Sequence, residues 1–233
     1  MHLKGITIDQ SKYPACDHYP FNLPVFKKTE RVTFNAPVTF FVGENGSGKS
    51  TLLRALSRSC GIHIRKKAER TCYNNPYENK LYDNLAIEWS NGKVPGSFFG
   101  SNIFHHFTEI LDEWAAADPG QLRYFGGQSL ITRSHGESLM SFFKARYRIK
   151  GLYVLDEPET ALSPRSQLVL HDFLTETGVK DHAQFIIATH SPILLACTCA
   201  LIYSFDYRPV RQIPYEETEQ YKIYRDFFEN GTN

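Results

Sequence analysis

An eight-residue loop motif constrains the fold of this chain more than any other stretch: Gly43-Glu44-Asn45-Gly46-Ser47-Gly48-Lys49-Ser50. It matches the pattern G-x-x-x-x-G-K-[ST] without a mismatch. Glycines let such a loop curl until several backbone N–H groups point at phosphate oxygens. The sequence also supplies the context that the mechanism needs, because an apolar strand pattern precedes the motif and a helical pattern follows it. The positive end of that helix dipole also favours phosphate.

The residue types of the loop predict their roles. Lys49 is expected to reach the β- and γ-phosphates as a point charge, and the Ser50 hydroxyl to ligate Mg²⁺. The sequence therefore predicts a phosphate-binding site with Mg²⁺ as cofactor, and the family resemblance given below implies ATP as the substrate. The predicted nucleotide-binding residues are Gly43, Glu44, Asn45, Gly46, Ser47, Gly48, Lys49, Ser50 and Thr51.

An acidic pair ends a second apolar run, Leu152-Tyr-Val-Leu155, which is typical of a strand buried on both faces. Asp156 is expected at the tip of the sheet beside the loop, as a Mg²⁺ ligand acting through water. Glu157 is then expected to project toward the γ-phosphate and to polarise an attacking water as the catalytic base. Carboxylates also end strands without any function, and Lys49 upstream is what favours catalysis here.

A third apolar run, Phe185–Ala188, ends in Thr189-His190-Ser191-Pro192. His190 is predicted to hydrogen-bond the γ-phosphate, so the predicted catalytic set is Glu157, His190 and Lys49. A lone histidine is more often structural, and its position one strand beyond the carboxylates favours the functional interpretation.

The element pattern indicates an α/β fold with a mostly parallel sheet covered on both faces. Strands are expected at Ile6–Ile8, over 32–42, and at 85–89, 152–155, 185–188 and 200–205. Helices are expected after Gly48, over 138–147, from Pro164 to about Thr175, and over 193–196, with helical character from about Phe98 to Tyr147.

Bulk properties exclude few classes. The net charge of +1 gives no global argument for nucleic acid or a membrane surface. No run of 18 apolar residues predicts a membrane span, and the first residues lack the features of a secretory signal. Five scattered cysteines are typical of reduced thiols, so we expect a cytoplasmic protein.

Together, the Gly43–Ser50 loop, the Leu152–Glu159 strand end and the segment 188–192 resemble the ABC-type ATPase family, particularly small single-domain ATPases related to SMC and recombination-type heads. The resemblance implies one ABC-type P-loop domain over 1–233, with N-terminal antiparallel strands and a helical lobe at about 98–148. The family signature, usually L-S-G-G-Q, corresponds to Ser134-His135-Gly136-Glu137-Ser138. His135 and Glu137 depart from that pattern.

The resemblance further implies a homodimer that forms on ATP binding. Ser134, Gly136 and Glu137 of one copy would then meet the ATP held by the other. Asn102 is the candidate for the family's Mg²⁺-sensing glutamine, and Tyr19 or Phe21 for the aromatic that stacks on adenine, with core packing as the alternative for both aromatics.

The sequence leaves open which of three roles ATP binding or hydrolysis serves. The first is an ATPase switch in nucleic-acid metabolism or defence, coupled to DNA or an effector protein. The second is the ATP-hydrolysing subunit of a membrane transporter, and the third a nucleotide sensor without turnover, against which the intact Glu157 argues. The aromatic-rich tail, Tyr215–Phe228, is expected to form a helix that caps the domain. Binding of a partner is the alternative.

Overall fold

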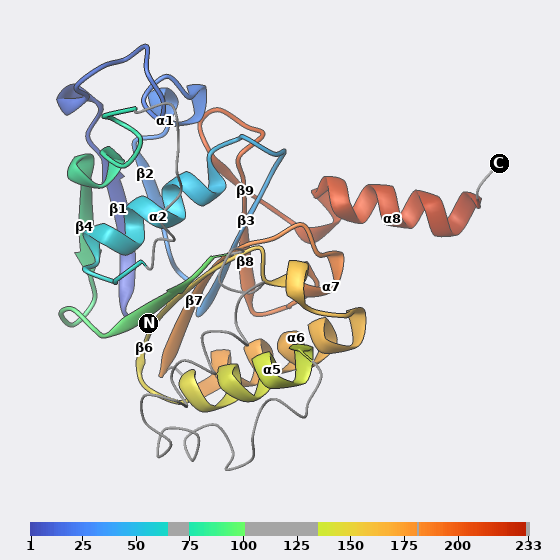
Figure 1. The fold of residues 1–233 in the computed structure, drawn as a ribbon. Coiled ribbons are helices and arrows are strands. Elements are labelled where there is room, and N and C mark those ends of the chain that lie inside the picture. Colours follow the sequence, from blue (N-terminus) through green and yellow to red (C-terminus); the bar gives the residue numbers. More distant parts are fainter. Residues whose placement is uncertain (65–74, 101–134, 181, 232–233) are drawn as a thin grey trace.

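The computed structural model describes residues 1–64, 75–100, 135–180 and 182–231. A six-stranded sheet lies between two layers (Figure 1). Helix α2 (Lys49–Ser59) and a small N-terminal sheet cover one face, and α5 (His135–Arg146) and α6 (Pro164–Lys180) cover the other. The predicted α/β class is confirmed.

The large sheet has the strand order β5-β6-β7-β3-β8-β9. All neighbouring strands are parallel except β9, which runs antiparallel to β8. Its strands are β3 (Val38–Val42), β5 (Gly96–Phe99), β6 (Gly151–Asp156), β7 (Ala183–Ala188), β8 (Ala200–Ser204) and β9 (Arg211–Ile213). Every residue of β3, β6 and β7 is buried, which explains their largely apolar sequences.

The small sheet is antiparallel, in the order β2-β1-β4. It consists of β1 (Leu3–Ile8), β2 (Arg31–Thr33) and β4 (Leu85–Trp89). The single strand predicted over 32–42 was wrong, because β2 and β3 belong to different sheets. Pro37 lies in the break, where it cannot donate a backbone hydrogen bond and only accepts one from Phe185 N.

The remaining helices are short connectors or terminal elements. They are α1 (Pro24–Lys28), α7 (Pro192–Leu195), α8 (Glu219–Asn230) and the 3₁₀ turns η1 (Gln10–Lys12), η2 (Leu81–Asn84), η5 (Pro158–Ala161) and η6 (Tyr215–Glu217). Helix α6 ends at Lys180, five residues beyond the predicted Thr175, and the residues Phe98 and Phe99 lie in β5 rather than in a helix.

Strand β7 shows how the central sheet forms two cores. Phe185 and Ile187 pack with Phe143 and Leu170 on the side of α5 and α6. Ile186 and Ala188, which alternate with them, face the opposite cluster, which contains residues of α2. Successive side chains of a strand point to opposite faces, so this strand is buried from both sides. The two cores hold the carboxyl ends of the strands in fixed register.

The C-terminal tail departs from the sequence prediction. Helix α8 forms, but every one of its residues is exposed or partly exposed, and it projects away from the body (Figure 1). The expectation that it caps the domain was wrong. Within the described part of the chain, no helix combines the length and apolarity needed to cross a bilayer.

Candidate functional site

Three adjacent strands bring the predicted residues to one edge of the large sheet. In the order β6-β7-β3, Ala188 pairs with both Asp156 and Phe41. The loop after Val42, the acidic pair and His190 therefore all follow strand ends at the same level. Ligands of open parallel sheets bind at such carboxyl ends.

The loop has the curled backbone that a phosphate cradle requires. Gly43, Gly46 and Gly48 all have positive φ, at 137°, 81° and 110°. At Gly43 an added Cβ would lie 2.9 Å from Asp206 Oδ1, so a side chain has no room there. Gly48 precedes α2 as its N-cap, which directs the helix N-terminus into the loop.

Lys49 lies inside this curl. Its ammonium donates to the carbonyls of Gly43 at 2.5 Å and of Glu44 at 2.8 Å, and the residue is only 4% exposed. Burial lowers the pKa of Lys49, while nearby carboxylates, Glu157 foremost, oppose that shift. A buried ammonium held by two backbone carbonyls can exchange them for the oxygens of an incoming phosphate.

Ser50, in the first turn of α2, is hydrogen-bonded directly to Asp156 at the end of β6. Ser50 Oγ donates to Asp156 Oδ1 at 2.8 Å. Asp156 is 2% exposed, and burial raises its pKa, against the opposing effect of the Ser50 bond. A hydroxyl and a carboxylate at this separation are the oxygen ligands that Mg²⁺ prefers.

Glu157 adopts a left-handed backbone, with φ 54° and ψ 57°. Among the described residues it is the one non-glycine residue with positive φ. Its N–H donates to Ala188 O at 2.9 Å, which fixes the turn against β7. Its partly exposed side chain acts electrostatically on both Lys49 and His190. Strained backbone of this kind is concentrated at functional sites.

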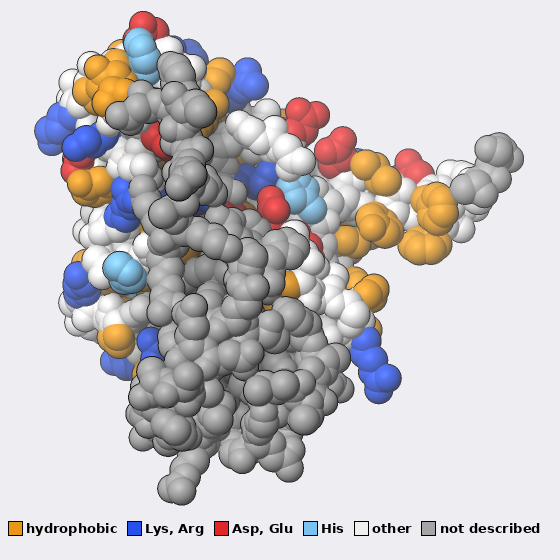
Figure 2. Space-filling view, in the orientation of Figure 1, with side chains coloured by type: hydrophobic (Ala, Val, Ile, Leu, Met, Phe, Trp, Pro, Cys, Tyr) orange, Lys and Arg blue, Asp and Glu red, His pale blue; other side chains and the backbone are white. Residues whose placement is uncertain are grey.

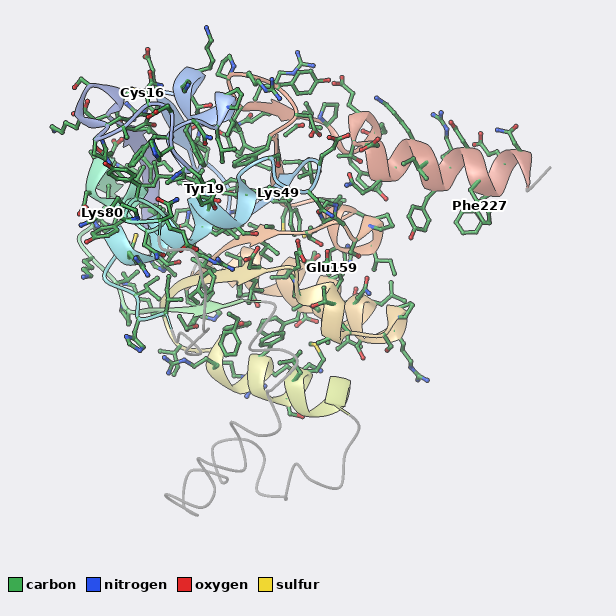
Figure 3. The ribbon with its side chains drawn as sticks, turned by 45° about the horizontal axis from the view of Figure 1, so that its top comes forward. Cys16, Tyr19, Lys49, Lys80, Glu159 and Phe227 are labelled. Carbon is green, nitrogen blue, oxygen red and sulfur yellow. The ribbon has the colours of Figure 1, made fainter. Side chains whose placement is uncertain are left out.

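A second carboxylate, Glu159, was missed by the sequence analysis. Its Oε1 accepts the backbone N–H of His190 at 2.5 Å, and its Oε2 accepts the Thr189 hydroxyl at 2.8 Å. Burial raises the pKa of Glu159, and the two hydrogen bonds oppose this. Figure 3 places Glu159 and Lys49 at the same edge of the sheet. Glu159 therefore ties the turn after β6 to the histidine segment.

His190 has an unsatisfied ring nitrogen. Its Nε2 is buried and has no hydrogen-bond partner among the described residues, while Nδ1 lies 3.4 Å from Gln220 Nε2 of α8. Burial, and secondarily the charge of Lys49, lower the pKa of His190 and favour the neutral ring. A neutral imidazole has one N–H to donate, so Nε2 can serve a phosphate oxygen.

Asp206 is the other residue that the sequence analysis missed. It follows β8, and its Oδ1 accepts the backbone N–H of Glu44 at 2.9 Å. Its Oδ2 accepts the Ser204 hydroxyl at 3.2 Å. This carboxylate braces the start of the loop from the neighbouring strand.

The two aromatic candidates for adenine separate clearly. Phe21 is fully buried against Tyr13 and is a core residue. Tyr19 is 39% exposed and its hydroxyl lies 2.7 Å from Thr51 Oγ1, on the first turn of α2. Tyr19 is therefore the one of the two that a base can reach.

The structure describes the predicted signature only in part. Ser134, like Asn102, lies outside the described residues, and Gly136 and Glu137 are described only as backbone in the first turn of α5. Their predicted roles remain predictions.

The residues present fit a Mg-nucleotide. The buried Ser47 Oγ, like His190 Nε2, lacks a partner among the described residues. Both atoms, together with the Lys49 ammonium, are polar groups suited to phosphate oxygens. The Ser50–Asp156 pair supplies oxygen ligands for the metal.

Comparison with known proteins agrees with this geometry. A family model described as an AAA domain matches residues 22–85. The chain is 29% identical over 182 residues to the phosphate import ATP-binding protein PstB 2 of Listeria monocytogenes, a match that covers 66% of this chain and 64% of that protein. The chain is therefore similar to ABC-type P-loop ATPases. A PstB protein of Shewanella denitrificans is 27% identical to this chain, with the same coverage.

Solved structures show the same fold. The chain aligns with cbiO1 of Clostridium perfringens, described as part of the ABC transporter complex cbiONQ, at a TM-score of 0.51 and 18% identity. That alignment covers 97% of this chain and 95% of cbiO1. At this identity the likeness concerns the fold alone, and the curated relatives are matched over less than two thirds of their length.

Proposed function

We propose that this protein binds ATP with Mg²⁺ and hydrolyses it at a site shared between two copies of the chain. The observation that carries the proposal is the bond between Ser50 and the buried Asp156, with the Lys49 ammonium in the same curl. Catalysis of phosphoryl transfer depends mainly on such positioning and on charge stabilisation.

Each side chain has a distinct task in this scheme. Ser50 and Asp156 hold Mg²⁺, which when bound neutralises charge on the phosphates. Lys49 exchanges its two backbone carbonyls for phosphate oxygens. Glu157, in its left-handed turn after β6, orients and polarises the attacking water. Neutral His190 donates from Nε2 to the γ-phosphate.

The second copy supplies Ser134, Gly136 and Glu137 at the open side of the nucleotide. The N-terminus of α5, where Gly136 and Glu137 lie, favours phosphate through its dipole. Hydrolysis removes the shared γ-phosphate and lets the two copies separate, so ATP biases a two-state switch.

The test combines turnover with mass in solution. Glu157→Gln is expected to bind Mg-ATP, to turn over at least about 100-fold more slowly, and to accumulate as a nucleotide-bound dimer. Lys49→Ala is expected to lose affinity for a fluorescent ATP analogue. Normal turnover in Glu157→Gln removes that residue from catalysis, and a wild-type protein indifferent to millimolar Mg-ATP refutes the proposal as a whole.

Two processes remain candidates for what ATP hydrolysis drives. A switch in nucleic-acid metabolism or defence was the first expectation from the sequence. The similarity to phosphate import ATP-binding proteins favours the second, the ATP-hydrolysing subunit of a membrane transporter at the cytoplasmic face. Stimulation of turnover by DNA supports the first, and co-purification with a protein of several membrane spans supports the second.

A further inference from the structure

The first turn of α8 reaches back to the candidate site. Gln220 is the second residue of this helix, and its Nε2 lies 3.4 Å from Nδ1 of His190. Figure 2 shows acidic side chains at the point where α8 leaves the body of the molecule. Gln220 is partly buried at this root, whereas the rest of the helix over 222–230 is exposed. The side chain that contacts His190 therefore comes from the inner end of the helix.

The root of α8 is tied to the segment that follows His190. Thr218, the N-cap residue of the helix, is fully buried, and its hydroxyl donates to Tyr215 O at 2.6 Å. Tyr215 in turn donates from its own hydroxyl to Pro192 O at 3.0 Å, two residues beyond His190. These two bonds hold the histidine segment and the first turn of α8 together, and they keep Gln220 beside the imidazole.

The two ring nitrogens of His190 have different surroundings. Nδ1 faces the Gln220 amide, whereas Nε2 is buried and has no hydrogen-bond partner among the described residues. The backbone N–H of the same histidine is held by a carboxylate oxygen of Glu159. The backbone and one ring nitrogen are therefore fixed by the protein, and the other ring nitrogen is left for a ligand.

The chemistry of the Gln220 contact determines where the ring proton lies. The nitrogen of a glutamine amide only donates, so Nδ1 beside it must accept. A neutral imidazole carries a single N–H, and its proton is then on Nε2. Burial, and secondarily the charge of Lys49, lower the pKa of His190 and favour this neutral ring. The carboxylates that oppose the shift in this pKa are those of Glu157, Asp206 and Glu219.

We propose that Gln220 is a positioning residue, which fixes His190 in the tautomer with the proton on Nε2 and directs that N–H to the γ-phosphate. The inference rests on the proposed function, in which His190 donates from Nε2. In the other tautomer, a bare nitrogen would face a phosphate oxygen, and two acceptors repel each other. The hydrogen bond at one ring nitrogen generally sets which nitrogen of a histidine carries the proton. Helix α8 thus acts on the site through one side chain of its first turn.

The tautomer can be measured without nucleotide, so this part of the test is independent of the proposed function. In protein labelled with ¹⁵N-histidine, long-range ¹H–¹⁵N spectra distinguish a protonated ring nitrogen from a bare one, and His190→Gln identifies the His190 signals by their loss. At about pH 8, where an imidazole is neutral, the wild type is expected to carry the proton on Nε2. Gln220→Glu, whose carboxylate only accepts, is expected to move it to Nδ1. Gln220→Leu should give a mixture of the two tautomers.

Turnover tests whether the tautomer matters for hydrolysis. Gln220→Glu is expected to lower kcat by about 10- to 100-fold, because one charge-assisted hydrogen bond to the γ-phosphate is lost. Gln220→Leu should lie between this variant and the wild type. Affinity for a fluorescent ATP analogue should change by less than about threefold, because Lys49 still binds the phosphates. Lys222→Gln makes the same change of charge on the exposed part of α8, and as the matched control it should leave tautomer and turnover unchanged.

The outcomes separate this inference from the proposed function. A proton on Nδ1 in the wild type, or a tautomer that neither Gln220 variant changes, overturns the inference. Normal turnover of Gln220→Glu with its proton on Nδ1 also overturns it. Nucleotide affinity that falls as far as turnover indicates general damage to the site and overturns the positioning role. A wild type indifferent to millimolar Mg-ATP refutes the proposed function instead, and the tautomer spectra then decide by themselves whether Gln220 orients the ring.

Discussion

Glu157 and Glu159 lie two residues apart, and the structure gives them separable tasks. Glu159 holds the His190 N–H and the Thr189 hydroxyl with its two carboxylate oxygens. Glu157 is partly exposed and lies in the strained turn that follows β6. We therefore predict that changing Glu159 affects mainly stability, and that changing Glu157 affects mainly turnover.

The magnitude follows from the bonds. A hydrogen bond to a charged group contributes about 1.5–3 kcal/mol, so Glu159→Ala removes roughly 3–6 kcal/mol of gross interaction. Relief of the desolvation that raises the pKa of Glu159 offsets part of this, and a net loss of about 2–3 kcal/mol is expected. Glu159→Gln can still accept from His190 N and donate to Thr189, so it should cost under about 1 kcal/mol.

Urea unfolding and a phosphate-release assay separate the two residues. With a denaturant slope of about 2–3 kcal/mol/M, Glu159→Ala should lower the midpoint by about 1 M, and Glu159→Gln by much less. Glu157→Gln should leave the midpoint within about 0.2 M and lose turnover. Equal midpoints for Glu159→Ala and the wild type refute the bracing role, and equal losses for the Ala and Gln variants refute the hydrogen-bond account.

Two further outcomes follow from the same site. Glu157→Gly removes the strain of a non-glycine residue at φ 54°. The melting temperature should therefore rise by about 2 °C while turnover is lost. A lower melting temperature would show that this backbone conformation is not strained. Because the folded pKa of His190 lies below its ordinary value of 6.5, the unfolded chain takes up the proton first as the pH falls. The free energy of unfolding should therefore fall between pH 7.5 and 5.5, and it should fall by more in the wild type than in His190→Gln. Denaturant titration at both pH values measures this difference. An equal fall in the two proteins contradicts the lowered pKa of His190.

Local sequence patterns were sufficient for the elements that end at the site. The runs before Gly43, Asp156 and Thr189 are apolar because β3, β6 and β7 are buried on both faces, and burial of that kind leaves an unmistakable composition. Polar residues directly after such runs must lie at the sheet edge. The loop, the acidic pair and His190 could therefore be placed together before the structure was seen.

The braces could not be found in this way. Asp206 meets Glu44 N across 162 residues, and Glu159 meets His190 N across 31. Such contacts depend on strand order, which periodicity does not encode. The tail shows a similar limit, because the spacing from Ile223 to Phe228 predicts an amphipathic helix but not what covers it. The hydrophobic pattern likewise did not reveal that β2 and β3 belong to different sheets. The only local signal of the break was Pro37, which lies between them.

The loop glycines offer a test in which backbone strain and packing separate. Gly46 and Gly48 both have positive φ, at 81° and 110°, so alanine at either position is strained by at least about 1–2 kcal/mol. A Cβ at Gly46 meets no atom within 4 Å, whereas at Gly48 it lies 3.1 Å from Phe26 Cζ and 3.2 Å from Val25 Cγ1. Gly48→Ala must therefore also shift the buried side chains of Val25 and Phe26 in α1, at a further cost of about 1–3 kcal/mol. Denaturant unfolding of the two variants should show Gly48→Ala as the less stable by that difference. Equal stabilities would mean that the α1 side chains move aside at no cost. The shape of the loop would then be determined by the backbone freedom of its glycines and not by packing against α1.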